Sequence, residues 1–188
     1  MKRRLMVLFV LAVCVLLPAY GTTDPLAAHQ QPVADVLRAM REPPIGELPP
    51  GEQVFRFLWL RSFDRPILVQ VTKDHATLSL LYKALDSPWY ANPDGVHLGR
   101  LIEERRTPVT QQAWDHLADM RRAVFWGHPS ADPATDIGVD GAMWIVEGRS
   151  WDQYHIVERW SPESGSFREL CLELLRLAAV DLAKDRVY

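Results

Sequence analysis

Three consecutive stretches of alternating hydrophobicity constrain the fold of this chain more than any other feature. They cover residues 55–60, 67–73 and 76–83, which read FRFLWL, ILVQVTK and ATLSLLYK. A period of two with aromatic and β-branched residues is typical of β-strands. Only short turns, at residues 63–66 and 74–75, separate the three stretches. Strands joined by such turns pair antiparallel, so the sequence predicts a β-meander.

The rest of the chain adds strands and two helices to this meander. We expect strands at residues 96–105, 141–149 and 153–160, a helix from the N-cap Thr110 to about residue 127, and a final helix from the cap Ser166 to about residue 184. Cys171 lies on the apolar stripe of the final helix, which predicts a buried, inert thiol. The predicted fold is α+β: an antiparallel sheet of five to six strands with two amphipathic helices packed on one face.

Residues 1–21 have the pattern of a secretory signal peptide. Three basic residues at positions 2–4 precede an apolar run at residues 5–17, and Pro18, Ala19 and Gly21 form the cleavage region. The apolar run is shorter than the ~20 residues that a membrane-spanning helix needs. We therefore expect an exported protein, periplasmic or secreted, with no membrane span after cleavage. The alternative is a signal that is retained as an anchor.

The chain behind the signal divides into two regions. Residues 22–52 contain six prolines and predict a proline-rich tether with a short helix at residues 33–40, which either docks on the domain or stays mobile. Residues 53–188 fit a single α+β domain. Without residues 1–21, the 21 basic and 24 acidic side chains become 18 and 24, a net charge of −6. This charge argues against nucleic acid as a partner, and the one remaining cysteine excludes an internal disulfide.

No familiar catalytic or cofactor motif occurs, and no two of the six histidines have the close spacing that preforms a metal site. We therefore expect no cofactor and no metal. Polar and aromatic residues with functional potential are densest at residues 136–162, around the last predicted hairpin. A three-residue loop at 150–152 would place Glu147 opposite His155, whereas a two-residue loop would place them on opposite faces. We favour the three-residue loop because it separates polar from aromatic side chains better.

With a three-residue loop, Glu147, His155 and Arg159 share one side of the hairpin, and we call these three residues the hairpin stripe. A carboxylate beside an imidazole can support a general base, and the Arg159 guanidinium can bind an anion. The same three side chains can equally form a structural ion-pair network.

Ligand-binding candidates outside the stripe are Asp140, at the start of the hairpin, and Trp89 and Trp151, in expected loops. Exposed loop aromatics stack on ligands or pack against partners. The favoured function is a non-enzymatic module that binds an envelope protein or a small polar ligand. The alternatives are an envelope hydrolase or transferase that uses the hairpin stripe, and an assembly subunit with a long unpaired edge strand. The oligomeric state stays open.

The hairpin region also resembles a family of small exported bacterial proteins with no established activity. The residues that carry the resemblance are Asp140-Gly141, Trp144, Glu147-Gly148, Tyr154-His155 and Arg159-Trp160-Ser161-Pro162, with weaker support from LWLRSF at 58–63. The resemblance implies the same α+β domain and implies no reaction.

Overall fold

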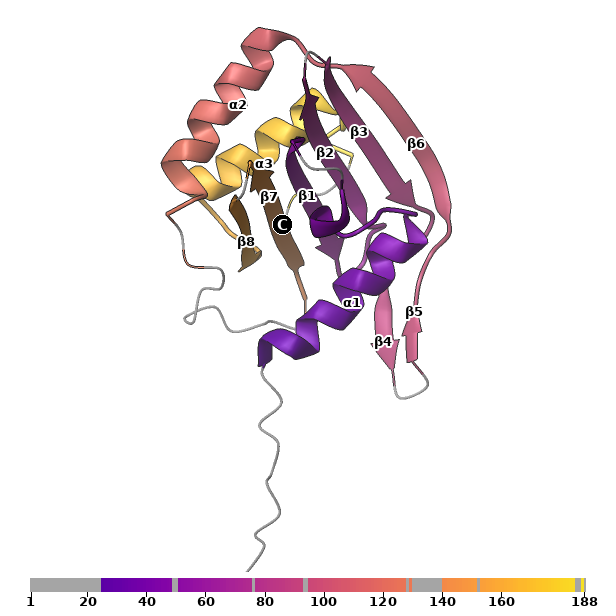
Figure 1. Cartoon of the computed structure of the whole chain (residues 1–188). Coiled ribbons are helices and arrows are strands. Elements are labelled where there is room, and N and C mark those ends of the chain that lie inside the picture. Colours follow the sequence, from indigo (N-terminus) through magenta and orange to yellow (C-terminus); the bar gives the residue numbers. More distant parts are fainter. Residues whose placement is uncertain are drawn as a thin grey trace, which may run out of the picture.

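A six-stranded antiparallel sheet forms the centre of the fold, in the order β6-β3-β2-β1-β7-β8 (Figure 1). The computed structural model describes residues 25–48, 51–75, 77–92, 95–127, 129, 140–151, 153–184 and 187. The strands of the sheet are β1 (Gln53–Arg61), β2 (Ile67–Asp74), β3 (Thr77–Leu85), β6 (Leu101–Pro108), β7 (Ala142–Ser150) and β8 (Gln153–Trp160). The other elements are α1 (Pro25–Ala39), a 3-10 helix (Ile45–Glu47), a small hairpin of β4 (Tyr90–Asn92) and β5 (Gly95–His97), α2 (Gln111–Val124) and α3 (Ser166–Leu177). The α+β class and the antiparallel sheet are thus confirmed, whereas the expected signal peptide lies outside the described residues.

The predicted meander occupies the middle of the sheet. β1 pairs with β2, and β2 with β3, all antiparallel, as the short turns require. The last hairpin extends the sheet from the other edge of β1, where β7 pairs antiparallel with β1. β1 therefore has a neighbour on both sides, and its side chains Phe57 and Trp59 are completely buried.

α2 and α3 cover one face of the sheet, as predicted. Their apolar side chains pack against the odd-numbered residues of β1 and the even-numbered residues of β7; among them are Phe57, Trp59, Trp144, Trp114, Leu117, Leu170, Cys171 and Leu174. α2 begins as expected, because Thr110 Oγ1 accepts a hydrogen bond from Ala113 N at 3.2 Å. Cys171 is fully buried, and this burial raises the pKa of its thiol well above the ordinary value.

α1 covers the opposite face of the sheet. Val36, Leu37 and Met40 are buried there, in one cluster with Leu58 and Ile145. The helix is therefore docked on the domain, which is one of the two alternatives that the sequence left open. α1 is also longer than expected, because it includes an internal proline at position 32. The carboxyl-terminal half of α1 makes the buried contacts, which offset the backbone hydrogen bond that a proline cannot form.

A buried polar group joins the sheet to the segment after α1, and we call it the Glu42 cluster. Arg56 is completely buried; its Nε donates to Gln70 Oε1 at 2.8 Å, and its Nη1 donates to Glu147 Oε2 at 3.4 Å. Lys83 Nζ lies 2.6 Å from Glu42 Oε1, and Arg56 Nη2 lies 3.6 Å from Glu42 Oε2. One carboxylate from outside the sheet thus pairs with two buried cations of the sheet.

Two expected boundaries are wrong. The strand expected at residues 96–105 begins at Leu101, because Asp86 Oδ1 accepts a hydrogen bond from Arg100 N at 2.8 Å and holds the preceding chain in a separate turn. α3 ends at Leu177 instead of near residue 184, because Ala179 adopts a φ of 53° and turns the chain out of the helix. Its N-cap is Gly165, and Ser166 is the first helical residue.

Candidate functional site

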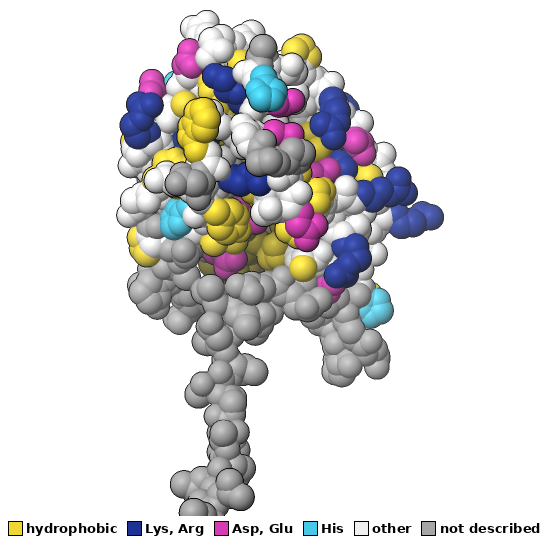
Figure 2. Space-filling view, in the orientation of Figure 1, with side chains coloured by type: hydrophobic (Ala, Val, Ile, Leu, Met, Phe, Trp, Pro, Cys, Tyr) yellow, Lys and Arg dark blue, Asp and Glu magenta, His cyan; other side chains and the backbone are white. Residues whose placement is uncertain are grey.

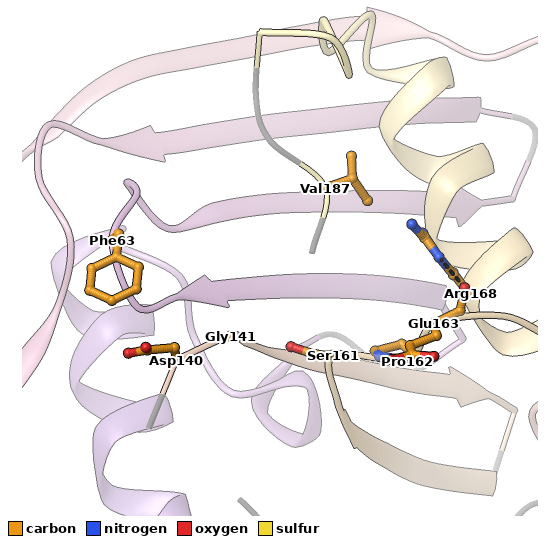
Figure 3. A pocket seen from close by; sticks show the side chains of 8 residues that line it. All are labelled: Phe63, Asp140, Gly141, Ser161, Pro162, Glu163, Arg168 and Val187. Atoms are coloured by element: carbon orange, nitrogen blue, oxygen red, sulfur yellow. Dashed lines mark hydrogen bonds between the residues drawn. The ribbon is translucent and has the colours of Figure 1, made fainter. Parts of the chain in front are cut away.

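Four segments that are distant in sequence meet at one end of the sheet. The antiparallel register places the carboxyl end of β1 beside the amino end of β7, and the carboxyl end of β8 beside them. A cavity of about 600 Å³ lies at this end of the sheet. It is surrounded by residues next to these strand ends, by α3 and by the chain after α3. We call this cavity the Phe63 pocket; it is lined by Phe63, Asp140, Gly141, Ser161, Pro162, Glu163, Arg168 and Val187 (Figure 3).

A set of short hydrogen bonds fixes the backbone at the base of the pocket. Ser62 N donates to Gly141 O at 2.9 Å, and Ser161 N donates to Ala142 O at 2.8 Å. Ser161 Oγ accepts from Ala142 N at 2.8 Å. A β-carbon at position 141 would lie 2.5 Å from Ser161 Oγ, so the close approach of these two chain segments requires glycine there.

Arg168 supplies a positive charge to the pocket from the first turn of α3. Its guanidinium lies over the ring of Trp144, 5.4 Å from the ring centroid, and its Nε donates to Glu163 O at 3.1 Å. Arg168 Nη1 is buried and has no hydrogen-bond partner, and no carboxylate of the described residues forms an ion pair with this side chain. A buried donor without an acceptor is costly, which makes Arg168 the most distinctive side chain of the pocket.

Two carboxylates and an apolar wall complete the lining. Asp140 lies beside Phe63 on one side of the pocket, and Glu163 lies near Arg168 on the other (Figure 3). Neither carboxylate forms an ion pair with Arg168. The ring of Phe63 is 66% exposed, which leaves its face available to a ligand. The pocket therefore combines charges of both signs with apolar surface, as binding sites for small molecules do.

The hairpin stripe does not form. β7 and β8 are joined by a two-residue loop, in which Ser150 pairs with Gln153, and Trp151 adopts a φ of 57°. The register pairs Glu147 with Ile156 and Gly148 with His155, so Glu147 and His155 point to opposite faces. The prediction of a three-residue loop was wrong, and so was the acid–base pair that depended on it.

The physical reason for this error is that both faces of the hairpin are covered. Glu147 faces α1, where it accepts a hydrogen bond from Tyr154 OH at 2.9 Å and pairs with Arg56. His155 lies on the other side, 5.0 Å from Phe125 between ring centroids. Segregating polar from aromatic side chains is favourable when one face is wet and the other dry, whereas each face of this hairpin contacts other parts of the protein. Burial and the nearby Glu147 carboxylate both raise the pKa of Tyr154.

Arg159 shares a face with His155 but is engaged elsewhere. Its Nη1 donates to Glu158 O at 2.6 Å, and its Nη2 donates to Pro129 O at 3.0 Å. Its guanidinium lies 5.7 Å from the centroid of the Phe167 ring. Arg159 is therefore a structural link between β8, α3 and the segment before β7, and it does not line the Phe63 pocket.

Of the three ligand-binding candidates outside the stripe, Asp140 lines the Phe63 pocket. Trp151 is 74% exposed at the tip of the β7–β8 hairpin, at the far end of β7 from Asp140. Trp89 is partly buried and packs against the apolar cluster below α1. The register puts these two tryptophans at opposite ends of the sheet, so they share no surface.

Sequence reasoning missed Phe63 and Arg168. The signal for Phe63 was an apolar side chain in a turn between two strands. For Arg168 the sequence offered only a cation in the first turn of a helix, where it is unfavourable to the helix dipole. Within the described residues, no three His, Cys, Asp or Glu side chains are grouped so as to hold a metal ion, and no helix is long and apolar enough to cross a membrane.

The fold and the pocket together define an α+β protein with helices on both faces of an antiparallel sheet and a ligand-sized cavity at one sheet end. No protein family model, curated protein or solved structure matches this chain.

Proposed function

We propose that this chain is an exported, non-enzymatic binding module whose small-molecule ligand occupies the Phe63 pocket. The observation that carries the proposal is Arg168, a cation without an ion-pair partner among the described residues, on the wall of a cavity of about 600 Å³. Cavities of roughly 300–1,000 Å³ with apolar walls and a few polar groups are typical of small-molecule sites.

Some of the residues that carry the resemblance to a protein family also lie at the Phe63 pocket. Asp140-Gly141 and Ser161-Pro162 carry the likeness to small exported bacterial proteins, and all four residues line the pocket. Export itself is inferred from the basic, apolar and small-residue pattern of residues 1–21. A binding role is favoured over catalysis because the pairing of Glu147 with His155, on which the catalytic alternative depended, is absent.

Melting experiments on residues 22–188 test the proposal. The panel contains free carboxylates, phosphates, amino acids, short peptides and sugars, each at millimolar concentration. A specific ligand at a hundredfold excess over its Kd stabilises the folded state by roughly 2.7 kcal/mol, which raises the Tm by about 5–10 °C for a chain of this size.

Phe63→Ala separates binding in the pocket from binding elsewhere. Phe63 is largely exposed, so we expect the variant to keep the Tm of the unliganded protein and to lose most of the ligand-induced shift. Ile102→Ala is the matched control, because Ile102 is an exposed apolar side chain on β6, at the edge of the sheet. A shift that Phe63→Ala leaves intact, or no shift with any compound, contradicts the proposal.

A further inference from the structure

We infer that the ligand of the Phe63 pocket is a zwitterion of the amino-acid or short-peptide class, bound with its carboxylate toward Arg168 and its ammonium group toward Asp140. This inference rests on the proposed function, because it names the ligand of the same pocket. It follows from three properties of the lining: the kind of charges, their arrangement and the apolar surface.

The cationic side of the pocket fits a carboxylate. Arg168 is held by the ring of Trp144 and by Glu163 O, so its guanidinium is positioned in advance of binding. A carboxylate accepts charge-assisted hydrogen bonds from a guanidinium, and such bonds are stronger than those between neutral groups. Arg168 has no carboxylate partner among the described residues, so a ligand carboxylate would complete its ion pair.

The opposite side of the pocket fits an ammonium group. Asp140 is exposed, forms no ion pair with a described residue and lies across the pocket from Arg168 (Figure 3). A ligand with negative charge alone would be repelled by Asp140 and Glu163. A neutral sugar would leave the charges of both signs without partners, which costs desolvation energy without a compensating interaction.

The lining also has apolar surface. Phe63 lines the pocket on the side of Asp140, Pro162 lines it on the side of Arg168, and Val187 is also part of the lining (Figure 3). These apolar side chains suit the side chain of a hydrophobic amino acid. A zwitterion with an apolar side chain therefore matches the pocket in charge at both sides and in apolar surface.

Binding of the dipeptide leucyl-phenylalanine and its blocked forms to residues 22–188 tests the inference by calorimetry. We expect the free dipeptide to bind, and we expect N-acetylation and C-terminal amidation each to weaken its binding about tenfold, because each removes one charge-assisted interaction. In Asp140→Asn, acetylation should lose its effect while amidation keeps it. In Arg168→Gln, amidation should lose its effect while acetylation keeps it.

Asp119→Asn and Arg122→Gln are the matched controls, because both side chains are exposed on α2 and pair with each other outside the pocket. They should leave the affinities for the free, the acetylated and the amidated dipeptide unchanged. The blocked peptides act on the unaltered protein, so the test stands even if Arg168→Gln does not fold.

Two different failures are distinguishable. If the dipeptide binds but neither block weakens it, or if a compound of another class binds in a Phe63-dependent manner and the dipeptide does not, the zwitterion inference is wrong and the binding function stands. If no compound of any class binds, both are wrong.

Discussion

Two side chains of α3, three residues apart, show how local position decides chemistry. Cys171 points into the core and is completely buried, whereas Arg168 lines the Phe63 pocket and forms no ion pair with a described residue. Burial raises the pKa of the Cys171 thiol, while the nearby Arg168 has the smaller, opposite effect. A thiolate is therefore not accessible at neutral pH, which agrees with the inert role predicted from the apolar stripe.

The raised pKa of Cys171 predicts a loss of stability in alkaline solution. Above pH 9, the thiol of the unfolded chain gives up its proton, while the buried thiol keeps it. The unfolded state then binds fewer protons, so the free energy of unfolding falls as the pH rises, by at most about 1.4 kcal/mol per pH unit from this group. Urea unfolding at pH 8 and pH 10.5 should show that the stability advantage of the wild type over Cys171→Ala shrinks. An advantage that stays constant over this range would refute the linkage.

At the scale of elements, the β7–β8 hairpin shows how one turn decides the position of every side chain. The two-residue loop places Trp151 in the left-handed region, which matches the twist of a tight hairpin but strains a residue with a β-carbon. A loop longer by one residue would have exchanged the two faces of β8. The hydrogen bond from Tyr154 OH to Glu147, and the ring contact of His155 with Phe125, agree only with the shorter loop.

Substitutions at Trp151 test this conformation. Trp151→Gly should be more stable than Trp151→Ala by about 1 kcal/mol, because glycine adopts a positive φ without strain. The side chain is largely exposed, so both variants lose little packing. At Ile102, an exposed strand position with ordinary backbone, the order should reverse and glycine should be the less stable residue. Urea unfolding measures both differences, and the same order at the two positions would argue against a strained turn.

At the scale of the whole molecule, the segment from Val36 to Ile45, which precedes β1, packs on the sheet. The apolar side of α1 covers one face of the sheet, and the Glu42 cluster adds ion pairs to completely or almost completely buried cations. On the surface, Lys and Arg side chains are interspersed with Asp and Glu (Figure 2). The interior below α1 thus combines an apolar cluster with buried ion pairs, in contrast to the apolar interior below α2 and α3.

Glu42→Gln tests the connection between the two parts of the molecule. The variant leaves Lys83 and Arg56 in the interior with one carboxylate fewer, and removing one partner of a buried ion pair is expected to cost about 3 kcal/mol. Glu47→Gln is the control, because Glu47 is exposed in the neighbouring 3-10 helix. We expect a lower free energy of unfolding in urea at pH 7 for Glu42→Gln alone. Equal stability of the two variants would mean that this segment is not held by its carboxylate.

The sequence by itself determined the fold class, the order of the main elements, the cap at Thr110 and the burial of Cys171. These features depend on periodicity and on side chains near in sequence, so they are local properties of the chain. The register of β7 and β8, the docking of α1 and the meeting of Phe63, Asp140, Ser161 and Arg168 were decided by the tertiary structure alone. The strand pairing that brings β1 beside β7 joins residues 81 to 95 positions apart, and no local sequence pattern determines which face of the sheet each neighbouring element covers.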